Sequence, residues 1–170
     1  RNAAEDLREK FAEADADLRR GLELAPNYAR GYEGLAAVLF QSVARRREAL
    51  EMLEKARRLD PLEMRLDVLK ALYLEWGPGD FAQADRILQT VLERDPLFVP
   101  ALVRLANVRS TGQGRHAEAV ALGEQAVALD PGNDTSWRHL VLSYISVGEI
   151  TGAKVAISHI SDHPALGPLN

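Results

Sequence analysis

The chain has 170 residues, of which 46% are hydrophobic and 27% charged, with 25 acidic side chains, 21 basic side chains and no cysteine. This composition predicts a soluble folded protein and excludes a disordered chain, because enough apolar material is present to form a core. The net charge of −4 gives no reason to expect nucleic acid or an anionic membrane as partner. The lack of cysteine excludes disulfides, thiolate metal sites and cysteine nucleophiles.

The sequence opens on RNAAEDLREK, without an initiator methionine or the apolar core of a signal peptide. It also contains no apolar run long enough to cross a bilayer. We therefore expect a fragment of a longer protein that is not inserted in a membrane. Both a cytoplasmic and a periplasmic location are compatible with these residues.

Prolines that each close an amphipathic run recur at an interval of 35 residues: Pro26, Pro61, Pro96 and Pro131. Twelve residues before each proline lies an alanine: Ala14, Ala49, Ala84 and Ala119. Such regular self-similarity indicates a structural repeat. A small residue that recurs on an apolar stripe marks a close approach of two helices, so we predict that Ala49, Ala84 and Ala119 are buried where helices cross.

The repeats predict the organisation of the chain from its beginning to its end. The opening segment, residues 1–25, is predicted to be one helix, with Ala14, Leu18 and Gly21 at the offsets that recur before the later prolines. The predicted repeats and the tail then follow at about 27–61, 62–96, 97–131, 132–163 and 164–170. The tail carries two prolines and shows no period.

Each repeat is predicted to be a helix, a tight turn and an antiparallel helix that ends at the proline. Glycine, which favours the backbone conformation that ends a helix, lies at the turn in three of the four repeats. The proline stops the second helix because it has no N–H to donate and restricts the residue before it. The apolar spacing of 3.6 residues predicts an all-α fold with roughly nine helices.

The register of the helix within 62–76 stays open at this stage. One register places Asp67, Lys70 and Ala71 on the packed face, and a shift of one residue places Leu66, Leu69 and Tyr73 there instead. The first repeat has no glycine at its turn, and Gly123 stands where a large residue is expected. We expect local irregularity at these places.

The last repeat carries the residues of a known helical repeat without an insertion: Trp137, Leu140, Tyr144, Gly148, Ala153 and Ile157. At this spacing the chain resembles the tetratricopeptide repeat (TPR) family, in the form of a bacterial-type TPR domain. The resemblance implies a single repeat domain over 1–170, built as a right-handed superhelical solenoid of about four hairpins after an N-terminal helix. The interval exceeds the family's 34 residues by one, and we expect the extra residue in the turn between helices.

In this family the first helices of successive repeats line a concave groove that binds partners. The family's groove positions fall on polar residues of three repeats: Arg30, Glu33 and Gln41; Arg104, Asn107 and Ser110; and Arg138, His139 and Ser146. Several are long hydrogen-bond donors, which suit an extended peptide with carboxylates. Some family members clamp a terminal carboxylate with Lys, Asn and Arg, and only Asn107 and Arg138 match that set.

The resemblance therefore predicts a protein–protein interaction scaffold that binds a peptide or protein through the groove. Two other functions stay open: a regulatory or targeting arm of a larger enzyme whose catalytic domain lies outside this fragment, and a structural spacer that associates with itself. The oligomeric state is not determined by the sequence.

The sequence predicts no catalytic, cofactor or metal site. His159 and His163 could share a helix face, but no glutamate lies between them and Pro164 indicates that the helix ends there. His139 has no serine or aspartate partner at a spacing typical of catalysis. The basic run at 45–47 is followed by several glutamates, so it does not indicate a nucleic-acid site.

Overall fold

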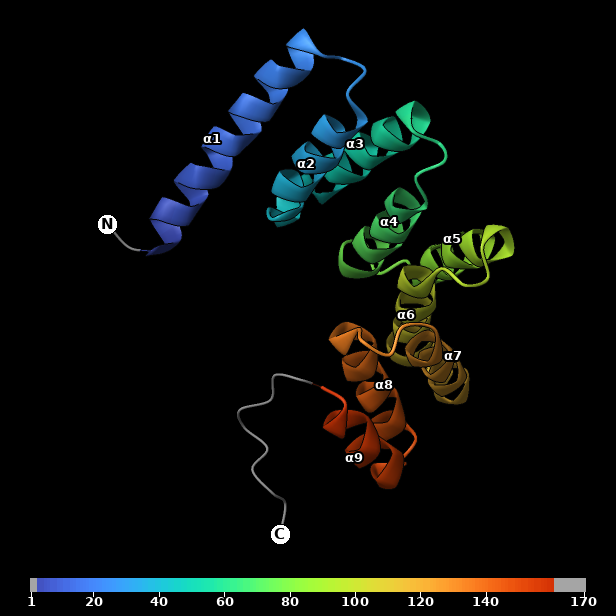
Figure 1. The fold of residues 1–170 in the computed structure, drawn as a ribbon. Coiled ribbons are helices and arrows are strands. Elements are labelled where there is room, and N and C mark those ends of the chain that lie inside the picture. The colour runs from blue at the N-terminus through green and yellow to red at the C-terminus, as the bar shows by residue number, and fades with distance from the viewer. Residues whose placement is uncertain (1–2, 161–170) are drawn as a thin grey trace. The chain divides into compact units, whose positions relative to one another are not determined.

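The computed structural model describes residues 3–160 (Figure 1), and the predicted tail at 164–170 lies outside them. The chain divides into two compact units, Arg1–Asp80 and Phe81–Asn170, called here the N-terminal and the C-terminal unit. Nine α-helices and two short helical turns make up the described residues, and no strand occurs among them, which confirms the all-α fold class. The unit boundary separates the two helices of the predicted repeat at 62–96. The single repeat domain over 1–170 stays a prediction.

The N-terminal unit consists of four α-helices in which each helix packs on the next. Their bounds are α1 Ala3–Leu24, α2 Ala29–Phe40, α3 Arg46–Leu59 and α4 Met64–Trp76, with a 3₁₀ turn, η1 Val43–Arg45, between α2 and α3. Consecutive helices run in opposite directions (Figure 1). Helix α1 lies within the predicted opening segment 1–25, and α2 and α3 lie within the predicted repeat at 27–61.

The core of the N-terminal unit settles the register of the helix at 62–76. Leu66 and Tyr73 of α4 are buried in this core and Leu69 packs against it. Lys70 is turned to Glu54 of α3, where its Nζ lies 2.8 Å from Oε2. Leu66, Leu69 and Tyr73 thus lie on the packed face, and Ala71 of the other register is fully buried beside them, so the packed face combines residues of both.

The C-terminal unit contains five α-helices, again packed in sequence. Their bounds are α5 Phe81–Arg94, α6 Val99–Asn107, α7 His116–Leu129, α8 Asp134–Ser146 and α9 Ile150–Ser158, with a π-helical turn, η2 Val108–Gly112, directly after α6. Besides packing on α7, α6 also packs on α8. This contact between first helices of neighbouring repeats places their polar side chains close together.

The π-helical turn η2 lies at the end of a first helix, just ahead of the turn where the extra residue of the repeat is expected. A π turn closes i→i+5 hydrogen bonds and accommodates more residues than an α turn, so we place the additional residue here. Arg109 holds the turn, because its Nε lies 3.0 Å from Oδ1 of the buried Asp85 on α5. Gly112 is required at its end, since an added Cβ would lie 2.8 Å from Cβ of Phe81 and closer still to its ring.

The recurring alanines lie at close helix contacts, as predicted. Ala49, Ala84 and Ala119 are fully buried, whereas Ala14 on α1 is half-buried. Gly123 has a comparable role on α7, because an added Cβ would lie 3.0 Å from Cδ1 of Leu140 on α8. Its missing side chain lets α8 approach α7, which explains why no large residue stands there.

A leucine at Ala119 should destabilise the fold. Ala119 is fully buried in α7, so the larger side chain has no space and overpacking should cost about 1–3 kcal/mol. The control is Ala121→Leu, which adds the same atoms at an exposed position of the same helix and should change the free energy of unfolding by less than about 0.5 kcal/mol. Chemical denaturation of both variants measures the difference. Equal stability of the two variants would show that Ala119 is not at a tight helix contact.

Candidate functional site

The C-terminal unit contains a cleft of about 500 Å³ between the end of α6, the turn η2, the start of α7 and α8. We call it the polar cleft, and its lining residues are Asn107, Ser110, Thr111, His116, His139, Leu142, Ser143 and Ser146. Two predicted groove residues, Asn107 and His139, meet here together with the serines at 110 and 146. The sequence pattern therefore gathers four of its candidate residues in one cavity.

Ser110 joins three elements at the centre of the polar cleft. Its Oγ lies 3.2 Å from Nδ1 of His116 on α7 and 3.3 Å from Oγ of Ser146 on α8. The π turn presents this side chain, and the packing of α6 on α8 brings Ser146 within reach. The local irregularity of the third repeat thus forms one wall of the site.

The donor and the acceptor of each hydrogen bond around Ser110 follow from the bond that Ser146 makes to the backbone. Ser146 Oγ donates its single proton to the carbonyl oxygen of Ser143 at 2.7 Å, so it can only accept from Ser110. Ser110 then has no proton left for His116, and its oxygen accepts from the Nδ1–H of that imidazole. A neutral His116 therefore carries its proton on Nδ1.

Two other hydroxyls of the polar cleft also donate to the backbone. Thr111 Oγ1 donates to the carbonyl oxygen of Asn107 at 2.8 Å, and Ser143 Oγ donates to that of His139 at 3.0 Å. Because their protons are engaged, the hydroxyls offer lone pairs rather than donors to a bound molecule. Donors for an anionic ligand must come from the nitrogen-bearing side chains.

His139 and Arg104 provide the electrostatic character of the site. Burial lowers the pKa of His139, and the positive charge of Arg104 lowers it further. The imidazole is therefore neutral at neutral pH, while the guanidinium close to it is charged. Arg104 does not line the cleft itself, and its charge acts on His139 from beside it.

Exposed apolar residues extend the site along α8. Arg138, Leu142 and Ile145 share one face of this helix because they are spaced by four and three residues. Leu142 is 61% exposed and Ile145 52% exposed. Arg138 is exposed but does not line the cleft, so it flanks the site rather than forming it.

The three predicted residues of the first repeat do not gather in one cavity. Arg30 is exposed near the start of α2. Glu33 faces α4, where its Oε2 lies 3.7 Å from Nη2 of Arg65. Gln41 follows the end of α2, donates from Nε2 to the carbonyl oxygen of Ala37 at 3.3 Å and lines a different cleft.

Sequence reasoning missed four of the lining residues: Thr111, His116, Leu142 and Ser143. His116 begins a second helix, and family groove positions are taken only from first helices. Leu142 was predicted neither as a groove residue nor as a core residue. Its spacing of four residues from Arg138 could have indicated that both lie on one face of the same helix. The signal for His116 was weaker, because it depends on the π turn beside it.

His159 makes an aromatic contact within the C-terminal unit. Its ring stacks on Trp137 with centroids 4.1 Å apart, and Nε1 of Trp137 donates to the carbonyl oxygen of Pro131 at 2.9 Å. His163, its proposed partner, lies outside the described residues. Within residues 3–160, no group of three or more His, Asp or Glu side chains is placed to hold a metal ion.

None of the helices described is both long and apolar enough to cross a membrane.

Comparison with known proteins identifies the fold. No protein-family model matches the chain, and no curated protein sequence is significantly similar to it. Among solved structures, PilW, a type IV pilus biogenesis factor, is 17% identical to this chain, with a TM-score of 0.75. The match covers 93% of this chain and 72% of the PilW chain. PilF from Pseudomonas aeruginosa is 18% identical, with a TM-score of 0.75 and coverage of 95% and 72%. MamA from Desulfovibrio magneticus is 19% identical, with a TM-score of 0.65 and coverage of 89% and 82%.

These three neighbours are TPR proteins. At such low identity the similarity shows the fold alone. The chain therefore has a TPR-like fold of helical hairpins, as the recurring prolines and alanines predict.

The pKa of His139 should lie below the ordinary value of 6.5. Replacing Arg104 with glutamine should raise it, but the value should stay below 6.5 because burial is the larger cause. Protonation then favours the unfolded chain, so this residue should reduce stability as the pH falls below 6.5. NMR titration of the imidazole in wild type and Arg104→Gln measures both pKa values, with Lys154→Gln on the exposed part of α9 as control. An unchanged midpoint in Arg104→Gln would contradict the proximity of the two charges.

Proposed function

We propose that the protein is a non-enzymatic scaffold that binds a peptide segment of a partner protein at the polar cleft. The observation that carries the proposal is the cleft itself, in which Asn107 and His139 meet between first helices of neighbouring repeats. Apart from the buried Ser143, its side chains on α6 and α8 are not among the packed residues of these helices. A surface that the fold does not need is available for a partner.

The chemistry of the cleft favours a peptide that carries both a carboxylate and an apolar side chain. Arg104 beside the cleft and Arg138 at its edge provide positive charge for the carboxylate. Leu142 and Ile145 provide an exposed apolar surface on the same helix face as Arg138. The hydroxyls that donate hydrogen bonds to backbone carbonyl oxygens still have lone pairs, and these can accept hydrogen bonds from peptide N–H groups.

The terminal-carboxylate clamp of the family is not the mode that we propose. Only Asn107 and Arg138 match it, and Arg138 stands outside the cleft. An internal aspartate or glutamate of the partner suits this arrangement equally, since no pair of donors for a chain-terminal carboxylate is gathered in the cleft. The proposal therefore specifies an acidic and partly apolar peptide without requiring a free C-terminus.

Loss of Arg104 and Arg138 together should weaken peptide binding at least tenfold. Hydrogen bonds to charged groups contribute about 1.5–3 kcal/mol each when they are shielded from water, and about 1.4 kcal/mol corresponds to a tenfold change in affinity. Peptides are selected from a random display library on the wild-type protein, and their affinities are measured by titration calorimetry. Affinity for wild type should also decrease as the salt concentration rises.

The control is the double variant Arg86→Ala, Lys154→Ala, which removes two exposed positive charges from α5 and α9 of the same unit. It should bind the selected peptides as wild type does. Circular dichroism should show helical structure in both double variants, because Arg104 is half-buried but lies outside the apolar core, and the other three residues are exposed. Substitutions at exposed positions usually change stability by less than about 0.5 kcal/mol each. Equal losses of affinity in the two double variants would show that only the net charge of the protein matters. Equal affinity of wild type and the Arg104→Ala, Arg138→Ala variant would overturn the proposal.

A further inference from the structure

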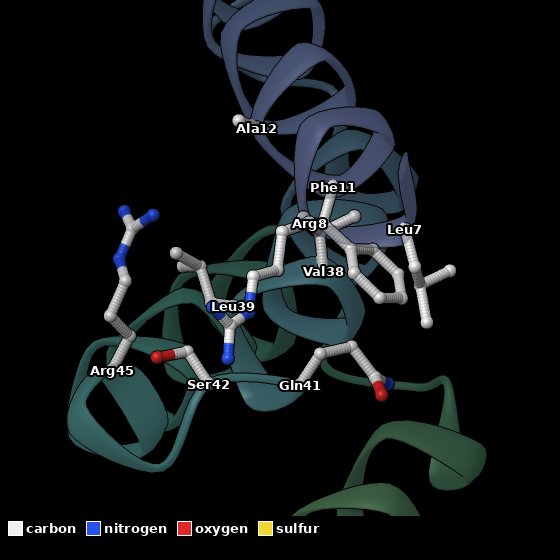
Figure 2. Close-up of a pocket in the computed structure, with 9 residues that line it drawn as sticks. All are labelled: Leu7, Arg8, Phe11, Ala12, Val38, Leu39, Gln41, Ser42 and Arg45. Carbon is white, nitrogen blue, oxygen red and sulfur yellow. The ribbon is translucent and has the colours of Figure 1, made fainter. Parts of the chain in front are cut away.

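The N-terminal unit contains a cleft of about 600 Å³ between the first half of α1 and the end of α2. Figure 2 shows Leu7, Arg8 and Phe11 projecting from α1, with Val38 and Leu39 on the facing helix. The helix α1 has 22 residues and α2 has 12, so α1 extends past its neighbour (Figure 1), and Leu7 is 53% exposed. We call this cavity the α1 cleft and compare its charges with those of the polar cleft.

The positive charges that line the α1 cleft do not depend on pH. They belong to two arginines, Arg8 and Arg45. Hydrogen bonds to Glu48 and Asp15 raise the pKa of Arg45 above its ordinary value, and an arginine side chain stays protonated throughout the physiological pH range. The two guanidinium groups therefore remain charged whatever the pH of the compartment.

The polar cleft is lined by no arginine, lysine, aspartate or glutamate among the described residues. The lining groups that can change their charge are the imidazoles of His116 and His139. Histidine is the side chain that ordinarily gains or loses a proton between about pH 5 and 8. The charge inside this cavity is therefore determined by the protonation of its imidazoles.

With neutral imidazoles, the polar cleft offers mainly hydrogen-bond acceptors. The protons of its four hydroxyls are engaged by backbone carbonyl oxygens or by one another. The Nδ1–H of His116 donates to Ser110, so Nε2 of that ring carries only a lone pair. A carboxylate needs donors, and the lining groups that can provide them are the amide of Asn107 and one ring nitrogen of His139.

Protonation of His139 changes this balance, because it adds a donor and a positive charge to the wall of the cavity. The residue is half-buried on α8. Burial disfavours the charged form and lowers the pKa of His139, and the charge of Arg104 on α6 lowers it further. A carboxylate in the cleft has the opposite effect, because a nearby negative charge stabilises the imidazolium.

No carboxylate of the described residues offsets the charge of a protonated His139. The charged groups on the elements around it are engaged or turned elsewhere: Arg109 of η2 lies 3.0 Å from a carboxylate of α5, Glu124 of α7 accepts from a tyrosine hydroxyl of α8 at 2.7 Å, and Lys154 of α9 is exposed. The charge that acts on this imidazole is that of Arg104. A bound peptide is therefore the source of the missing negative charge.

We propose that His139 binds the carboxylate of the partner peptide as an imidazolium, so that an acidic peptide binds the polar cleft more tightly at lower pH. The site and its occupant are those of the proposed function, on which this coupling rests. The proton comes from solvent and goes to the ring nitrogen of His139 that lacks one, and the peptide itself is not altered. The imidazolium then provides, inside the cavity, the charge that Arg104 and Arg138 provide only beside it.

The direction of the pH dependence follows from the difference between the free and the bound protein. The carboxylate raises the pKa of His139, so the complex retains a proton that the free protein loses as the pH rises. A rise of one pKa unit corresponds to about a tenfold gain in affinity once the pH lies below both values. Because an aspartate or glutamate of the peptide has a pKa of about 4, it stays ionised while this gain develops.

Affinity should therefore increase at least about threefold between about pH 7.5 and about pH 5.5. Titration calorimetry of the selected acidic peptides at both pH values measures it, and two buffers with different ionisation enthalpies give the number of protons taken up on binding. A peptide in which the acidic residue is replaced with its amide should show neither the gain nor the uptake.

His139→Gln keeps a polar side chain that cannot be protonated, and it should lose both the gain in affinity and the proton uptake. The matched control is His159→Gln, which makes the same exchange at an exposed position outside the polar cleft and should retain both. Circular dichroism at the two pH values checks that each variant keeps its helices.

Arg104→Gln distinguishes proton binding at His139 from a structural role of this residue. The midpoint of the pH dependence should move to higher pH in this variant, because the charge that lowers the pKa of His139 is absent. NMR titration of the imidazole with and without saturating peptide should show the higher pKa in the complex. A structural role alone would leave both midpoints where they are.

Two results would overturn the coupling and leave the binding site in place, provided that Arg104→Ala, Arg138→Ala still weakens binding. One is an affinity for acidic peptides that is independent of pH or that decreases as the pH falls. The other is a gain that persists in His139→Gln and disappears in His116→Gln, which would assign the proton to the second imidazole. Equal affinity of wild type and the double arginine variant would instead remove the proposed function, and the coupling with it.

Discussion

The close contact between helices at the recurring alanines is the constraint on which the other features depend. Ala49, Ala84 and Ala119 have no exposed surface, so the neighbouring helix lies against the backbone of the one that carries the alanine. In the C-terminal unit the packing of α6 on α8 also brings short side chains together, and Ser110 on η2 lies 3.3 Å from Ser146 on α8. Packing thus forms the floor of the polar cleft as well as the core.

The two clefts differ because packing is complete around one and incomplete beside the other. At the polar cleft, helices surround a cavity in which serine hydroxyls donate to backbone carbonyl oxygens. The lone pairs of these hydroxyls remain available to accept hydrogen bonds from a bound molecule. At the α1 cleft, a helix extends beyond its neighbour, and its apolar residues remain partly exposed.

The sequence predicts the helical hairpins, their ends and the buried alanines because each depends on local propensity and on a period of fixed length. It left the register at 62–76 open, since Asp67 and Lys70 of α4 are partly buried by ion pairs rather than fully exposed. The π turn and the role of His116 were not predictable, because both depend on how Arg109 and Gly112 pack on α5. The lowered pKa of His139 likewise arises from burial and from Arg104, which only the fold brings together.

The central claim is that a partner peptide binds between α6 and α8. NMR chemical-shift mapping with a selected acidic peptide on isotopically labelled protein tests it most directly, because every backbone amide reports separately. We expect the largest shift changes around Asn107, Ser110, His139 and Ser146, which line one cavity. Changes confined to α5 or α9 would contradict it, because those helices contribute no residue to the polar cleft.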